Sequence, residues 1–387
     1  MTFNDKKGFG KFKTVNTHFH YLYPRSVDET LDIYKNLIDY FEYDSICILS
    51  VASNVHRESV DASANVKGLY YKAKLNSELP GCCYLYGSAL HFYDERDTAD
   101  GYLKQAEAIY EMGCDGFKSL DGKPTHRKPL GRPLCDPVFD KMYGFLEEVG
   151  MPVKMHVTDP RKYWGKKEDM TAEAIARGWW YGDGSYPSFE EIHAEVREIM
   201  RKFPRLKLCL AHMGYLTDSV SDWEYLLNKY ENTSYDLTPG AAEFLSFTSE
   251  PDTWHRMFEK YSDRIFFGTD TYNNLEDAPE DIATGNYEKT GTRHFYLKNA
   301  LEGDPTKPFE TNVGVVTPLG LNSKILQNVY YDGFLALHGE PRPVNSAAAI
   351  RQLAFDRELI TTGAFPMPDD EKRTELENLH KIEKYFG

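Results

Sequence analysis

The sequence predicts an α/β fold: a (β/α)8 TIM barrel with long loops at its C-terminal face and a C-terminal helical extension. From Thr14 onward, short β-rich runs alternate eight times with helical patterns, and turn or cap residues stand at many of the joins. Four of these runs also carry the members of one candidate metal site: His18 and His20, His156, His212, and Asp270. An open doubly wound sheet is the alternative, because periodicity does not show whether a parallel sheet closes.

Each predicted strand is a short run enriched in β-branched, aromatic or other apolar residues, as strands of a parallel sheet are. The eight runs are residues 14–21, 45–51, 82–90, 114–120, 152–159, 206–214, 233–238 and 264–271.

Capping signals place several of the helices between the strands. Residues 26–29 (SVDE) and 188–191 (SFEE) both match a capping box, in which a serine oxygen and a glutamate bind the free amides of the first turn. Asp136 followed by Pro137 is a further start signal, and that helix should end near Gly150.

Two long segments interrupt the alternation. Residues 160–187 follow the fifth strand and residues 272–318 follow the eighth, so both would leave the C-terminal mouth of the barrel as candidate lids.

The end of the chain departs from the barrel pattern. We divide the chain into a barrel, residues 1–338, and an extension, residues 339–387, with helical patterns at 346–359 and 369–385. The extension would pack on the barrel or on a second subunit of a homo-oligomer.

The composition favours a cytoplasmic enzyme that acts on a small molecule. Lys and Arg number 45 against 60 Asp and Glu, which gives a formal charge of -15 and argues against nucleic acid or an anionic membrane as a partner. The chain shows no export signal and no apolar run long enough to cross a bilayer. The six cysteines lack the paired spacing of a zinc site and are expected to be reduced and buried.

His18 and His20 form the first part of a candidate metal site. Residues two apart on a strand point to the same face, so both imidazoles should enter the barrel. A His-x-His alone is weak evidence. However, His156, His212 and Asp270 each interrupt or close a later apolar run, and catalytic groups of this fold gather at the strand ends. Together these positions predict one metal site.

The expected ligands are His18, His20, His156 and Asp270. Three neutral histidines and one carboxylate leave a charge of about +1 on a divalent ion, enough to acidify a bound water. His212 would accept a proton or polarise a carbonyl group, and Asp270 would also shuttle a proton, which makes both catalytic. Imidazole and carboxylate suit Zn²⁺, with Mn²⁺, Fe²⁺ and Co²⁺ as alternatives.

This arrangement resembles the amidohydrolase superfamily, specifically its amidohydrolase-2 branch. The resemblance runs from Thr14 to Gly339 and includes the stretches GCDGFKSL, GMPVKMHV, FPRLKLCLAHMG and DRIFFGTD. It implies a metal-dependent hydrolase or a nonoxidative decarboxylase of an aromatic or unsaturated acid.

One position departs from that family pattern, and a second bears on whether the site holds one metal ion or two. The family often has aspartate where this chain has Asn16, so a contact near the first ligand should differ. Lys118 stands where binuclear relatives carry a carboxylated lysine that bridges two metals. In this branch a lysine in the GFK context more often stays an unmodified amine, so one metal ion is expected.

The candidate substrate contacts are Lys118, Arg25, Arg161 and Trp164. The three cations would follow strands at the mouth and could bind a carboxylate, although each is also a common surface charge. Trp164 could close over a ring, whereas aromatic residues of a long loop usually pack the loop itself.

Three functions follow from these observations. The first is hydrolysis of a C–O or C–N bond of a small, carboxylated metabolite by a metal-activated water. The second is decarboxylation with the same ligands. The third is a catalytically inactive barrel with a binding role, which would not require the five polar positions.

Overall fold

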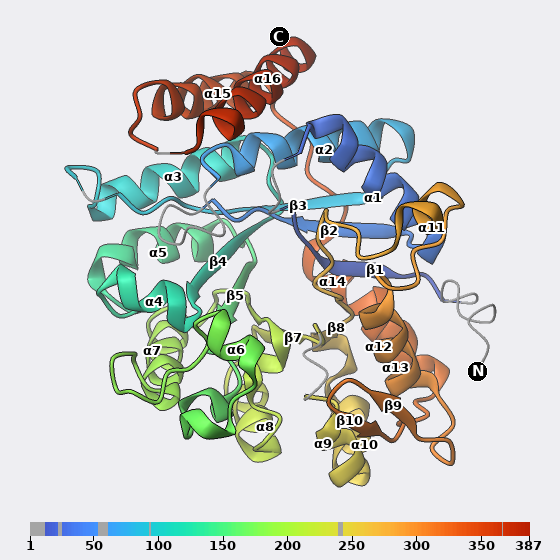
Figure 1. The fold of residues 1–387 in the computed structure, drawn as a ribbon. Helices are drawn as coiled ribbons and strands as arrows, with labels where there is room; N and C mark the ends of the chain where they lie inside the picture. The colour runs from blue at the N-terminus through green and yellow to red at the C-terminus, as the bar shows by residue number, and fades with distance from the viewer. Residues whose placement is uncertain (1–11, 22–24, 53–60, 93, 239–242, 366) are drawn as a thin grey trace.

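In the computed structural model, which describes residues 12–21, 25–52, 61–92, 94–238, 243–365 and 367–387, eight parallel strands lie side by side in sequence order (Figure 1). They are β1 (Val15–Phe19), β2 (Ser45–Leu49), β3 (Cys83–Gly87), β4 (Gly116–Gly122), β5 (Val153–Val157), β6 (Leu208–Leu210), β7 (Thr233–Asp236) and β8 (Ile265–Phe266). All eight predicted strands are confirmed.

The first and last strand segments meet, so the sheet forms a nearly closed barrel. Thr17 N–H donates to the Phe267 carbonyl at 3.0 Å, and His20 N–H donates to the Thr271 carbonyl at 2.7 Å. Phe19 and Thr271 also form a parallel bridge. The (β/α)8 prediction is therefore confirmed, and the open doubly wound alternative is excluded.

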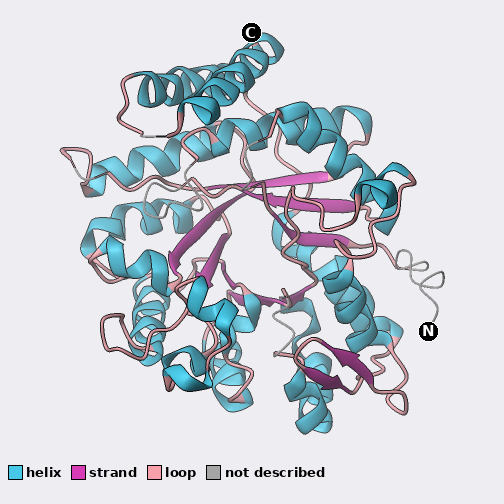
Figure 2. Ribbon diagram, in the orientation of Figure 1, coloured by secondary structure: helices cyan, strands magenta, loops and turns pink. Residues whose placement is uncertain are grey.

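Helices surround the strands (Figure 2). In the barrel region they are α1 (Val27–Phe41), α2 (Ala64–Glu78), α3 (Ala99–Glu111), α4 (Pro124–Leu130), α5 (Asp140–Glu148), α6 (Ala172–Ala176), α7 (Phe189–Lys202), α8 (Val220–Lys229), α9 (Leu245–Ser249), α10 (Pro251–Tyr261), α11 (Pro279–Ala283), α12 (Thr292–Glu302), α13 (Ser323–Gln327) and α14 (Gly333–His338).

The predicted helix caps form as expected. Ser26 and Ser188 each make a reciprocal capping box with a glutamate three residues later. Asp136 caps a short 3-10 turn, residues 137–139, that leads into α5, and Gly150 follows the helix with a φ of +66°.

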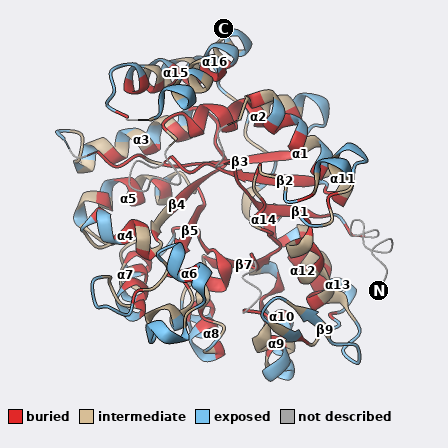
Figure 3. Cartoon of the chain, in the orientation of Figure 1, coloured by how far each residue is buried: buried red, intermediate tan, exposed pale blue. Residues whose placement is uncertain are grey.

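Two apolar cores hold the barrel together, and the strands are buried throughout most of their length (Figure 3). The larger core lies between strands and helices. The smaller one contains side chains of β1, β2, β3, β6 and β8 together with Phe334 of α14. Tyr84 and Phe334 meet edge to face at 5.0 Å, so α14 packs onto this inner cluster. All six cysteines are unpaired, and five of them are buried.

Both long segments contain some regular structure. Residues 160–187 hold two 3-10 turns and α6, and residues 272–318 hold α11, α12 and a hairpin of β9 (Phe309–Thr311) and β10 (Gly314–Val316). The segments follow β5 and β8, so both leave the barrel at the carboxyl end of its strands.

The C-terminal extension is a pair of helices, α15 (Ser346–Thr361) and α16 (Asp369–Phe386), that packs against α2 and α3 (Figure 1). Buried Asn378 of α16 accepts the Val27 N–H at 3.0 Å, and Lys67 of α2 pairs with Glu375 at 3.1 Å. The extension therefore rests on the first helices of its own barrel. Within the ranges given above, no helix is both long enough and apolar enough to span a membrane.

Candidate metal centre

Three predicted ligands converge at the end of the barrel. His18 and His20 leave β1 on the same face, and their Nε2 atoms lie 3.0 Å apart. Asp270, four residues beyond β8, brings its Oδ1 to 3.5 Å from His18 Nε2 and 3.4 Å from His20 Nε2. Among the described residues, this is the group of histidine, cysteine and acidic side chains whose ligand atoms come close enough to hold a metal ion.

The hydrogen bonds of the two imidazoles direct lone pairs toward one another. His20 Nδ1 donates to the Leu49 carbonyl at 3.0 Å, and His18 Nδ1 donates to Asp236 Oδ2 at 2.8 Å. Burial lowers the pKa of His20 to about 4, so its ring is neutral and its Nε2 is unprotonated at neutral pH. Two ring nitrogens and a carboxylate oxygen therefore face one another as acceptors, and a cation would relieve their repulsion.

Asp270 is oriented by residues of the segment that follows it. Arg293 Nη1 donates to its carbonyl oxygen at 2.8 Å and to its Oδ2 at 3.0 Å, and the Tyr272 hydroxyl donates to Oδ2 at 3.1 Å. Burial opposes the charge, but His18, Arg293 and His20 hold the pKa of Asp270 well below its ordinary value. Because Oδ2 is engaged, Oδ1 is the oxygen left to face the histidines.

Asp236 is a site residue that sequence reasoning missed. It is fully buried at the end of β7, where it binds His18, accepts the His212 N–H at 2.9 Å and pairs with Lys154 at 2.9 Å. Lys154 also donates to the Thr17 carbonyl at 2.7 Å. The available signal was an acid at the end of the predicted strand TSYDLT, the same signal that identified Asp270.

His156, the fourth expected ligand, does not join the three converging side chains. Its Nε2 lies 3.3 Å from Asp159, a carboxylate that pairs with Lys123 at 3.0 Å. The His156 ring packs 4.6 Å from the ring of His212, which in turn lies 5.4 Å from the ring of His18. His156 and His212 therefore border the cluster, and burial lowers the pKa of His156 to about 3.

Left-handed backbone gathers at these strand ends. Thr158, His212 and Asp270 have φ values of 58°, 55° and 54°, which side chains with a Cβ rarely adopt. Each follows the end of a different strand, β5, β6 or β8. Such strain is retained where surrounding contacts enforce it, and it is common in functional sites.

Lys118 projects from β4 without a partner. Its side chain is 1% exposed, and within the described residues its Nζ makes no hydrogen bond. Burial lowers the pKa of Lys118 to about 8, and its charge in turn contributes to lowering the pKa values of His18 and His20. It thus lies within electrostatic reach of the metal cluster.

Asn16, the departure from the family pattern, links the first and last strand segments. Its Oδ1 accepts the Thr269 N–H at 3.1 Å, and its Nδ2 donates to Thr269 Oγ1 at 2.7 Å. It also accepts the His18 N–H at 3.3 Å. Asn16 therefore orients the backbone of a ligand.

Arg161 and Trp164, two of the predicted substrate contacts, bind protein groups. Arg161 pairs with Asp218 at 2.8 Å and with Glu190, and more than a third of its side chain is exposed. Trp164 donates its indole N–H to the Pro187 carbonyl at 3.0 Å. The structure thus shows both residues packing the segment after β5.

The backbone of Arg25, a third predicted contact, is bound to the extension. Its carbonyl oxygen accepts from Asn378 Nδ2 at 3.0 Å. Sequence reasoning placed Arg25 at the mouth, just after β1, and it lies two residues before α1.

Comparisons with known proteins agree with this fold. A family model described as amidohydrolase matches residues 88–288, more than half of the chain, a range that includes Asp270 but begins after His18 and His20. No curated protein matches the chain.

The chain is also similar to solved structures, at low sequence identity. A protein of Staphylococcus aureus assigned provisionally as an amidohydrolase is 13% identical over 84% of this chain and 99% of its own, with a TM-score of 0.51. 4-Oxalomesaconate hydratase from Rhodopseudomonas palustris is 13% identical over 84% of this chain and 95% of its own, with a TM-score of 0.48. 2,6-Dihydroxybenzoate decarboxylase complexed with 2,6-dihydroxybenzoate is 15% identical over 74% of this chain and 99% of its own, with a TM-score of 0.41. At 13% identity, the similarity to the Staphylococcus aureus structure concerns the fold alone.

Proposed function

The chain belongs to the amidohydrolase family, whose members include hydrolases and decarboxylases, and from that premise we propose that it is a metal-dependent hydrolase acting on a C–O or C–N bond of a small molecule. The observation that carries this proposal is the convergence of His18 Nε2, His20 Nε2 and Asp270 Oδ1. Two buried imidazole nitrogens and a partly buried carboxylate oxygen that face one another are unfavourable unless a cation lies between them.

The donor set favours zinc. Neutral imidazole and carboxylate are common zinc ligands, and the hydrogen bonds of His18 and His20 resemble those that fix ligand histidines. We propose His156 as a fourth ligand, since its ring borders the cluster through His212. When bound, the ion supplies a Lewis acid that polarises the substrate and lowers the pKa of water.

Two side chains are proposed to handle protons. Burial lowers the pKa of His212, so this ring is neutral and able to accept a proton at neutral pH. Its position is fixed by the hydrogen bond from its backbone N–H to Asp236 and by stacking of its ring on that of Tyr215, with centroids 5.1 Å apart. Asp270 is ionised, and its carboxylate can pass a proton toward the leaving group.

Lys118 is the favoured substrate contact of the four predicted. Its ammonium has no competing hydrogen bond among the described residues, whereas Arg161 already pairs with Asp218 and Glu190. Arg25 and Trp164 remain candidates at the mouth.

Metal analysis tests the centre itself. Purified protein should contain about one equivalent of zinc or manganese per chain by elemental analysis, and a His18→Ala, His20→Ala double variant should lose it. The matched control is His380→Ala, which removes an exposed histidine of α16 and should leave the metal content unchanged. Equal metal in both variants would remove the basis of the proposal.

Product analysis separates hydrolysis from decarboxylation. The metal-loaded protein would be screened against lactones, amides and aromatic acids in water enriched in ¹⁸O. Incorporation of one ¹⁸O atom into the product supports hydrolysis. Release of carbon dioxide with no ¹⁸O in the organic product supports the decarboxylase. A metal-free chain without activity on any of these compounds supports the binding role.

A further inference from the structure

Asp159 connects a proposed metal ligand to the long segment that follows β5. It stands two residues beyond the strand and is 2% exposed, although it carries a carboxylate. Its Oδ1 lies 3.3 Å from His156 Nε2, and its Oδ2 accepts the hydroxyl of Tyr181 at 2.5 Å. Lys123, the residue after β4, donates to both oxygens at 3.0 and 3.2 Å. The carboxylate is therefore held by groups from three parts of the chain.

These contacts determine which nitrogen of His156 carries the proton. A carboxylate that pairs with an ammonium is ionised and can only accept, so the nearby Nε2 of His156 must donate to it. A neutral imidazole has one N–H, which leaves the lone pair of His156 on Nδ1. His18 and His20 show the reverse arrangement, because each donates from Nδ1. Asp159 thus selects the form of His156 whose Nδ1 is the acceptor.

Tyr181 anchors the segment of residues 160–187 to this carboxylate. The structure describes the whole segment, and its two buried residues are Ala174 and Tyr181, which are 4% and 1% exposed. The ring of Tyr181 packs 4.9 Å from that of Trp164 and 4.7 Å from that of Tyr186, so the segment itself holds this side chain. Movement of the segment away from the barrel would therefore withdraw a hydrogen bond from Asp159.

We propose that Asp159 is a positioning residue of the metal centre, which orients His156 for a cation, and that Tyr181 makes this orientation depend on the segment of residues 160–187. The inference rests on the proposed function, in which His156 is the fourth ligand. Attachment of the segment and binding of the metal then favour each other. Because such coupling is reciprocal, a bound ion should hold the segment against the barrel by the same factor.

Zinc affinity, measured by competition with a chromophoric chelator, tests this inference. Asp159→Ala should weaken zinc binding by about 10- to 100-fold, the loss typical when the partner of a ligand histidine is removed. Asp159→Asn keeps an oxygen that can accept from His156 and should restore part of that loss. Tyr181→Phe keeps the packed ring, removes only the hydroxyl, and should weaken zinc binding by about twofold or more.

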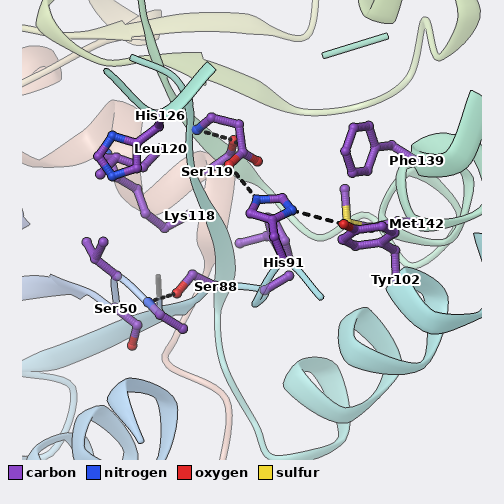
Figure 4. Close-up of a pocket in the computed structure, with 15 residues that line it drawn as sticks. Ser50, Ser88, His91, Tyr102, Lys118, Ser119, Leu120, His126, Phe139 and Met142 are labelled. Carbon is purple, nitrogen blue, oxygen red and sulfur yellow. Dashed lines mark hydrogen bonds and ion pairs between the residues drawn. The ribbon is translucent and has the colours of Figure 1, made fainter. Parts of the chain in front are cut away.

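Tyr102→Phe is the matched control for the loss of a buried hydroxyl. Tyr102 of α3 lines a small pocket, where its hydroxyl contacts His91 Nδ1 at 3.0 Å, and His91 Nε2 lies 2.7 Å from Asp121 (Figure 4). This network also joins a buried tyrosine, a histidine and an aspartate, but its histidine is not a proposed ligand. Tyr102→Phe should therefore leave zinc affinity unchanged.

The proton position on His156 can be measured in the metal-free wild type. Ring nitrogen shifts of protein labelled with ¹⁵N-histidine distinguish the two neutral forms, and the His156 signals are identified by their absence in His156→Gln. We expect the proton of His156 on Nε2. A proton on Nδ1 would overturn the inference, and this result does not depend on whether Asp159→Ala folds.

Hydrogen exchange gives the reciprocal measurement. The Tyr181 N–H, which donates to the Tyr163 carbonyl at 2.8 Å, should exchange more slowly in the zinc-loaded wild type than in the metal-free protein. Asp159→Ala should lose this difference. Equal exchange of the wild type with and without zinc would contradict the coupling between the segment and the metal.

Failure of this inference and failure of the metal proposal give different results. If the wild type binds zinc and both Asp159→Ala and Tyr181→Phe bind it as tightly, the metal centre stands and Asp159 has no part in it. A wild type that binds no zinc refutes the metal proposal, and the inference falls with it.

Discussion

Arg293 is the residue that most directly couples the long segment after β8 to the proposed metal ligands. Its guanidinium bridges the carbonyl oxygen and Oδ2 of Asp270, a residue in left-handed backbone conformation. We expect Arg293→Ala to weaken zinc affinity by about 10- to 100-fold, as loss of a partner of a ligand typically does. Competition with a chromophoric chelator measures this change.

The control for that variant is Arg351→Ala. Arg351 makes an exposed ion pair with Glu111, and its removal should leave zinc affinity unchanged. If Arg293→Ala binds zinc as the wild type does, the bridge to Asp270 has no part in holding the metal.

Lys118 should also leave a signature in the pH dependence of stability. Its folded pKa of about 8 lies below the ordinary lysine value of 10.5, so the unfolded chain binds more protons between these limits. Lys118 therefore destabilises the fold below pH 8, by up to about 3 kcal/mol at 1.4 kcal/mol per pKa unit, and this cost disappears as the pH rises through 10.5.

Lys118→Met should consequently be more stable than the wild type at pH 7, with the difference shrinking toward pH 10.5. Urea unfolding of both proteins across this range measures the difference. A variant that is less stable by the same amount at every pH would contradict it and would indicate a packing role for the side chain.

At the scale of residues, the proposed metal ligands could be predicted from the sequence, but the residues that orient them could not. Strand geometry puts His18 and His20 on one face, and Asp270 closes an apolar run, so all three could be predicted. Arg293 lies in a long segment whose course no local pattern specifies, and Asp236 meets His18 across more than 200 residues of sequence. The orientation of an imidazole ring could not be predicted either: His156 directs its Nε2 toward Asp159.

At the scale of elements, the strands and capped helices were predictable because their signals are local. Apolar runs mark the strands, and serine with glutamate three residues later marks the starts of α1 and α7. The strand ends were predicted less well. Residues 264–271 form regular strand only at Ile265–Phe266, because the residues beyond bond irregularly to the first strand segment and turn left-handed at Asp270.

Asn378 should link the stability of the extension to that of the first barrel helix. Its side chain accepts the first free N–H of α1, from Val27, and donates to the carbonyl of Arg25. Asn378→Ala leaves the buried Val27 N–H and the partly buried Arg25 carbonyl without this partner, so we expect a loss of about 1–3 kcal/mol in the free energy of unfolding. Denaturant titration measures it.

Asn312→Ala is the matched control, since Asn312 is exposed in the turn of the β9–β10 hairpin and should change stability little. Equal stability of the two variants would show that α16 does not support the start of α1.

At the scale of the whole molecule, closure of the barrel brings together groups that are far apart in the chain. Asp236, Asp270, Lys118 and Lys154 all lie in or beside the barrel end, with the histidines among them. The contacts of Asp270 with His18 and His20 join the segments of the first and last strands. The cluster can therefore form only when the fold is complete, and a ligand bound there should stabilise the whole barrel.

Zinc should accordingly raise the stability of the folded chain. Free zinc at about 1,000 times its dissociation constant would add about 4 kcal/mol to the free energy of unfolding, provided that the unfolded chain does not bind it. We expect calorimetry to show a higher Tm for the zinc-loaded wild type than for protein stripped with a chelator, and no zinc-dependent difference for the His18→Ala, His20→Ala variant. The His380→Ala control should respond to zinc as the wild type does, because its histidine lies on exposed α16. If the double variant were stabilised by zinc as much as the wild type, the ion would bind elsewhere on the chain, since the converging Nε2 atoms would be absent.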